Sequence, residues 1–141
     1  MPTKTDIRTA AQSQIVTGAA FGARVFIGKK DALSEDQLPA AVVQIVSEEI
    51  ELISHTPRRF VRRLELMIEG YDKATASLET EERLDILADA IEAAILTDKT
   101  LGGIVKDCRP VNIEYENPDA GSQVFGTIKM TYSVEYETQE S

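Results

Sequence analysis

The side chains that could do chemistry in this chain are few, and their types limit what that chemistry could be. Among 141 residues there is a single histidine, His55, and a single cysteine, Cys108. A general base at His55 needs a nucleophile beside it, and no nucleophile motif places a serine or a cysteine there. We therefore expect His55 to be an exposed turn residue. Cys108 precedes a predicted strand and is expected to be a small buried hydrophobic residue.

Metal and phosphate sites are not indicated either. One histidine cannot make a paired-histidine metal site, and one cysteine cannot make an internal disulfide. The glycines form neither a phosphate loop nor a dinucleotide fingerprint, because both need fixed spacings between a strand and a helix. A set of carboxylates at helical spacing is typical of a solvated face: Glu81, Asp85, Asp89 and Glu92. We expect no catalytic residue, no cofactor and no metal.

One basic cluster stands out from an otherwise acidic chain. Four of the fifteen basic residues lie close together, at Arg58, Arg59, Arg62 and Arg63. The preceding predicted strand carries acids at Glu48, Glu49 and Glu51. In a hairpin that turns at residues 54–57, the acids and arginines would be cross-strand neighbours on a solvated strand end. They could equally pair between identical subunits, acid edge to basic edge, in a head-to-tail ring. These seven residues are the candidate subunit or partner interface.

Composition narrows the class of protein. Twenty-four acidic residues against fifteen basic ones give a net charge of −9. That balance argues against sequence-specific nucleic acid binding, because a phosphate backbone needs positive charge opposite it. No run approaches the roughly 20 apolar residues that span a bilayer, and no apolar segment follows the N-terminus as in a secretory signal. We expect no membrane contact, and one domain over residues 1–141.

Hydrophobic periodicity predicts two helices. Over residues 3–17, apolar and small residues recur at three- and four-residue spacing, with Thr3 or Thr5 as the cap. The stronger signal covers residues 78–96, where the apolar stripe is continuous: Leu84, Leu87, Ala88, Ile91, Ala94 and Ile95.

The remaining segments predict strands. They are residues 24–27, 38–53, 60–71, 111–116 and 124–137, with a five-residue turn at 117–121. No single register buries every apolar residue of 47–53, which indicates a bulge or a strand that leaves the sheet. The order α-β-β-β-α-β-β with short turns favours an α+β fold: a mainly antiparallel sheet with two helices packed on one face.

The order of elements and several segments resemble the tail terminator proteins of long-tailed bacteriophages, the family of the lambda minor tail protein U. The resemblance covers most of the chain. It rests on the short strand after the first helix, on the strand opening Leu38–Val43, on the hairpin leading into Phe60–Ile68, and on the closing strand Ile128–Glu137. The stretch Thr100–Val105 is also similar to phage tail completion proteins.

The resemblance implies a function. Such proteins form a ring of six subunits on the open end of the finished tail tube, stop further polymerisation and offer a surface for the head connector. It implies a structural protein of the virion tail, assembled in the host cytoplasm and without enzymatic activity. The implied partners are copies of itself in a ring, expected to be a hexamer, together with the tail tube protein and the head-tail connector protein. Another connector or tail completion subunit, or a small cytosolic enzyme, is the alternative.

Overall fold

Two helices and five strands make up the described part of the chain. The computed structural model describes residues 3–18, 25–27, 40–72, 80–116 and 126–139. The helices are α1 (Lys4–Gly18) and α2 (Thr80–Leu96). The strands are β1 (Val25–Ile27), β2 (Ala40–His55), β3 (Arg58–Asp72), β4 (Asp107–Glu116) and β5 (Gly126–Gln139). The predicted order α-β-β-β-α-β-β is confirmed.

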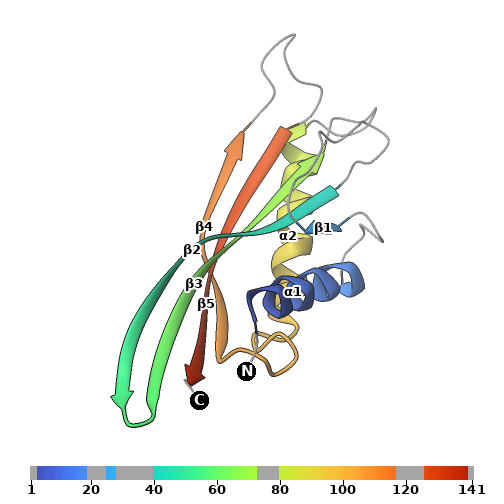
Figure 1. Ribbon diagram of the computed structural model, residues 1–141. Coiled ribbons are helices and arrows are strands. Elements are labelled where there is room, and N and C mark those ends of the chain that lie inside the picture. Colours follow the sequence, from blue (N-terminus) through green and yellow to red (C-terminus); the bar gives the residue numbers. More distant parts are fainter. Residues whose placement is uncertain (1–2, 19–24, 28–39, 73–79, 117–125, 140–141) are drawn as a thin grey trace.

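The strands form one sheet, and both helices lie against the same face of it (Figure 1). The strand order is β1-β2-β3-β5-β4. Short β1 runs parallel to β2, and every other neighbouring pair is antiparallel. The predicted α+β fold, with a mainly antiparallel sheet and two helices on one face, is confirmed.

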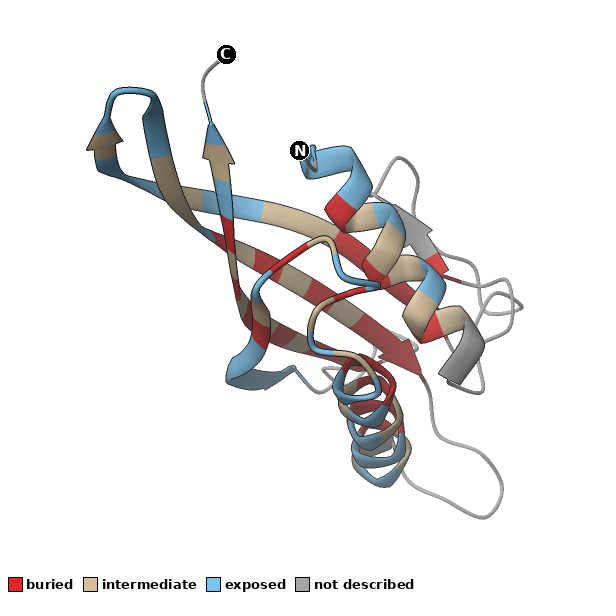
Figure 2. Ribbon diagram, turned by 90° about the horizontal axis from the view of Figure 1, so that it is seen from below, coloured by how far each residue is buried: buried red, intermediate tan, exposed pale blue. Residues whose placement is uncertain are grey.

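The core lies between the helices and the sheet (Figure 2). On β5, alternate side chains are fully buried at Ile128, Met130, Tyr132 and Val134, as the period-two pattern predicts. The facing residues of β3 and the helix stripes are buried with them: Leu64, Leu66, Ile68, Ile7, Ala11, Ile15, Leu84, Leu87, Ala88, Ile91, Ala94 and Ile95. The apolar periodicity therefore identified the core faces of both helices and of both central strands.

Local contacts hold the helix ends. The Thr3 hydroxyl accepts a hydrogen bond from the Asp6 backbone N–H, and the Asp6 carboxylate accepts one from the Thr3 N–H. This reciprocal capping box starts α1. Gln14 of α1 donates through Nε2 to the carbonyls of Ala94, Ile95 and Asp98 at distances of 2.8–3.1 Å. It thus satisfies carbonyls that the C-terminus of α2 leaves without helical partners.

Gly70 on β3 allows α2 to approach the sheet closely. A Cβ atom at this position would lie 2.8 Å from both Leu87 of α2 and Ile128 of β5. Side chains do not approach that closely without displacement, so the contact requires glycine.

The long β2–β3 hairpin extends well past the helices (Figure 1). Its pairing shifts between Ile45 and Ser47 and again between Leu52 and Ser54, which confirms the predicted irregularity in β2. We call residues 46–63 the hairpin arm. The turn is shorter than the predicted residues 54–57, because pairing continues to His55 and Arg58 and leaves only Thr56 and Pro57 between the strands. The structure therefore corrects that boundary.

The edge strand β4 differs from its prediction in two respects. It begins at Asp107, so Cys108 lies within the strand and pairs with Val134. The alternating residues Val111, Ile113 and Tyr115 are 37–61% exposed, although the Tyr115 hydroxyl donates a 2.8 Å hydrogen bond to Asp85 of α2. The predicted strand opening at residues 38–39, the turn at 117–121, Val124 and the helix residues 78–79 lie outside the described residues.

Candidate interaction surface

The hairpin arm exposes apolar side chains. Val46, Ile50, Leu52 and Ile53 are 41–54% exposed. Ile50 pairs with Arg62, and Leu52 with Phe60. This register places Ile50 and Leu52 on the sheet face that carries the buried Leu64. Past the ion pair of Glu48 and Arg62, which lies on this same face, exposed apolar residues thus recur along the arm beyond the cover of this chain's own helices. Such exposed patches commonly mark interaction sites.

A buried carboxylate anchors the base of the arm. The Glu48 side chain is only 8% exposed and lies 2.6 Å from Nη1 of Arg62 and 3.6 Å from Nζ of Lys4. The Tyr136 hydroxyl donates a hydrogen bond of 2.6 Å to its second oxygen. Burial alone would raise the pKa of Glu48, but the hydrogen bonds from Tyr136 and Arg62 and the nearby positive charges outweigh it and lower that pKa.

The opposite face of the arm carries exposed ion pairs. Arg63 lies 3.1 Å from Glu51 and 3.4 Å from Glu135, and Arg59 lies 3.0 Å from Glu137. Each of these arginine side chains is 45% exposed. Such solvated pairs contribute little to folding, so their charges remain available to a partner.

The predicted cross-strand neighbours are confirmed within one chain. Glu48 contacts Arg62, Glu51 contacts Arg63, and Glu49 stands opposite Arg63 in the register. Arg58 is exposed at the turn, opposite His55. The role of these residues between subunits stays a prediction. Sequence reasoning missed the role of β5. This strand is distant in the sequence and supplies further contacts to Arg59, Arg63 and Glu48, through Glu137, Glu135 and Tyr136 respectively.

The α2 helix presents a second exposed surface, of which sequence reasoning singled out only carboxylates. Ile86 and Leu96 are 55% and 58% exposed. Acidic residues and one alanine share this side of the helix. We call the whole set the α2 stripe: Glu82, Asp85, Ile86, Asp89, Ala93 and Leu96. The i, i+4, i+7 spacing of Glu82, Ile86 and Asp89 could have revealed it, had the outer face been read for apolar residues as well as charges.

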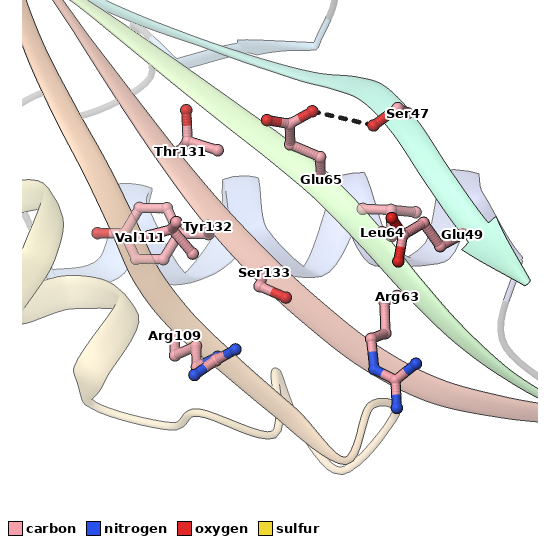
Figure 3. Close-up of a pocket in the computed structure, with 10 residues that line it drawn as sticks. All are labelled: Ser47, Glu49, Arg63, Leu64, Glu65, Arg109, Val111, Thr131, Tyr132 and Ser133. Atoms are coloured by element: carbon pink, nitrogen blue, oxygen red, sulfur yellow. Dashed lines mark hydrogen bonds between the residues drawn. The ribbon is translucent and has the colours of Figure 1, made fainter.

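A shallow groove of about 410 Å³ crosses the sheet face that the helices leave open (Figure 3). Hydroxyl and charged side chains line much of it, among them Arg63, Glu65, Arg109 and Ser133. Ser47 donates a 2.9 Å hydrogen bond to Glu65. No histidine or cysteine is among its lining residues.

The remaining candidate residues do not assemble into a reactive site. His55 is exposed beside the turn, as expected. Cys108 is 2% exposed, and burial, with a smaller effect of Asp107, raises its pKa to about 12. Asp85 and Asp89 face solvent. Among the described residues, no three histidine, cysteine or acidic side chains are grouped as metal ligands would be. The helices in the described ranges include none long and apolar enough to cross a membrane.

Comparison with known proteins identifies the family. The family model for phage minor tail protein U matches residues 2–136, so the chain belongs to that family. Family membership supports a structural role in a phage tail. No curated protein matches the sequence. Among solved structures, a chain described as "Virion of native gene transfer agent (GTA) particle" is similar with a TM-score of 0.51 at 13% identity, covering 94% of this chain and 95% of that one. At that identity the similarity concerns the fold.

Proposed function

We propose that this protein is a tail terminator. Copies of it form a ring, expected to be a hexamer, on the end of the completed tail tube. The ring stops addition of tube protein and offers a surface to the head-tail connector protein. The observation that carries this proposal is the family match over nearly the whole chain. The protein acts in the virion tail, and its assembly takes place in the host cytoplasm.

The surface of the molecule supports a role in assembly. The hairpin arm exposes apolar residues beyond the helices, and the α2 stripe exposes more of them among acids. Apolar patches bordered by charges fit contacts between protein subunits. A net charge of −9 keeps free copies apart and soluble until a tube end brings them together.

We propose that the protein has no enzymatic activity. In the described part of the chain, the one histidine is exposed near the tip of the arm, and the one cysteine is buried in the core with a raised pKa. The groove on the open sheet face is shallow and has no histidine or cysteine in its lining, and the described residues include no metal ligand set, which supports binding rather than catalysis.

The test is binding to tube ends. Purified protein is mixed with tail tubes that lack it, free tube subunits are added, and the tubes are imaged by electron microscopy. The proposal predicts a ring with a central hole at one end of each tube and no growth at that end. Tubes that bind the protein at one end and still elongate would point to a connector or tail completion subunit. Absence of binding would contradict both assignments.

A further inference from the structure

The helix-side face of the hairpin arm lacks the layer that covers the rest of the sheet. Ile50 and Leu52 lie on the sheet face that holds Leu64, beyond the ion pair of Glu48 and Arg62, and they are 54% and 41% exposed. In the core of this chain, helices fill that layer (Figure 1). An α+β sheet buries its apolar face under helices. A helix with exposed apolar residues is therefore the element that fits the arm.

The α2 stripe has the matching composition. Ile86, Ala93 and Leu96 follow one side of the helix with spacings of seven and three residues. The only basic residue of α2 is Arg83, which lies 3.0 Å from Asp72 of its own chain. The charged residues of the α2 stripe are therefore all acidic: Glu82, Asp85 and Asp89.

The tip of the arm has the opposite charge. Arg58 is exposed and shares the face of Phe60, two positions away on β3, and the turn before it carries no acid. Arg59 points to the opposite face, where it pairs with Glu137. The stripe runs for about 20 Å at 1.5 Å per residue, and the exposed half of β2 for about 30 Å at 3.3 Å per residue. A helix laid along the arm would thus set apolar residues against apolar residues and acids beside the basic tip.

We propose that the arm of one copy receives the α2 stripe of the next copy. Ile50, Leu52 and Phe60 meet Ile86, Ala93 and Leu96, while Arg58 faces Glu82 and Asp89. The arm and the outer side of α2 lie on different parts of the molecule (Figures 1 and 2), so each copy offers both halves of the contact. Such a head-to-tail contact repeats from copy to copy and closes into a ring when the rotation allows. The inference rests on the self-association that the proposed function requires.

A disulfide cross-link tests the contact. In a Leu52→Cys, Leu96→Cys variant, oxidation of concentrated protein and of tube-bound protein is followed by non-reducing gel electrophoresis. We expect a ladder of covalent multimers, with each single variant giving at most a trace of dimer. Native Cys108 is buried and stays out of the reaction. Dimers from Leu52→Cys alone would overturn the proposal in favour of an arm–arm contact. No multimers in either sample would overturn it too.

Charge reversal tests the pairing of the two surfaces. Arg58→Glu should weaken self-association about tenfold, because like charges then meet across the contact. Adding Glu82→Lys and Asp89→Lys should restore most of it. The control Arg109→Glu makes the same change of net charge on the open face of the sheet and should have little effect. If adding Glu82→Lys and Asp89→Lys does not restore the self-association of the arm variant, the proposal is overturned.

The two tests separate this inference from the proposed function. If the unmodified protein caps tail tubes and the paired cysteines do not cross-link on them, the contact is wrong and the terminator role stands. If the cysteines cross-link successive copies into multimers and the protein leaves tube growth unchanged, the contact is right and the terminator role fails.

Discussion

At the scale of single residues, Glu48 shows how one side chain fixes the base of the arm. Its carboxylate is buried, and three elements reach it through Lys4, Arg62 and Tyr136. Removing a partner from such a site leaves polar groups without hydrogen bonds, which costs more than the bond contributes on average. The arm thus begins at a polar junction rather than at the apolar core.

Replacing Glu48 with glutamine should make the fold less stable in a pH-dependent way. We expect a loss of about 1–3 kcal/mol at pH 7 in urea denaturation. The lowered pKa means that the glutamate stabilises the fold above its ordinary pKa of 4.5, and that this stabilisation is lost as the pH falls below it. The difference between wild type and Glu48→Gln should therefore shrink from pH 5 towards pH 3.

An exposed pair provides the control for this prediction. Glu51→Gln removes the solvated partner of Arg63 and should change the stability little at either pH. A Glu48→Gln variant as stable as Glu51→Gln at pH 7 would show that the junction is not a folding determinant.

The burial and pairing of a residue could be predicted from the sequence only where they depend on neighbouring residues in the chain. The buried Cys108, the exposed His55 and the pairing of Glu48 and Glu51 with arginines follow from composition and from one hairpin. The hydrogen bond from Tyr136 to Glu48 could not be predicted, because the two residues are 88 positions apart in the sequence. Periodicity places Tyr136 on the inward face of β5 but says nothing of which strand end it reaches.

At the scale of elements, Gly70 sets how closely α2 packs on the sheet. Gly70→Ala should destabilise the fold by about 1–3 kcal/mol in urea denaturation, because the added Cβ overlaps Leu87 and Ile128. In a background that carries Leu87→Ala, the same change should cost less, since one of the clashing atoms is gone. Equal costs in both backgrounds would argue against a helix–sheet clash.

The hairpin arm is the element whose role is assembly rather than folding. Ile50→Ser with Leu52→Ser should leave the urea midpoint nearly unchanged, because both residues are already largely exposed. The same variant should lose self-association and tube capping, as measured by light scattering and electron microscopy. Val111→Ser, at an exposed apolar position on edge strand β4, is the matched control and should behave like wild type.

Either of two results would contradict this assignment of the arm. Unfolding of the variant at a lower urea concentration would make the arm part of the folding core. Normal capping of tubes by the variant would place the subunit contacts elsewhere.

Elements with strong periodicity were predictable, and their mutual arrangement was less so. Both helices, the alternation along β3 and β5 and the irregularity in β2 follow from apolar spacing, because a half-buried element must repeat with its own period. The capping of α2 by Gln14 and the close approach at Gly70 depend on packing between distant segments. The exposure of the arm likewise depends on where the helices end, which strand patterns do not encode.

At the scale of the whole molecule, the fold separates a helix-covered half from a projecting hairpin. One chain therefore carries both an uncovered sheet face and an uncovered helix face. A net charge of −9 opposes self-association of free copies, and added salt screens that repulsion. Light scattering should therefore show a larger mass at a given protein concentration in 0.5 M salt than in 0.05 M salt. A mass that falls with salt would show that ion pairs, rather than apolar contacts, dominate the assembly.

The terminator role is tested by the length of tail tubes in cells. Lysates of the phage that carries this gene are compared with lysates of the same phage after deletion of the gene, and tubes are measured by electron microscopy. We expect overlong tubes without heads after deletion, and a single normal length once the gene is supplied. Tubes of normal length without heads would mean that the protein joins head to tail without ending the tube. Complete particles in the absence of the gene would contradict the account outright.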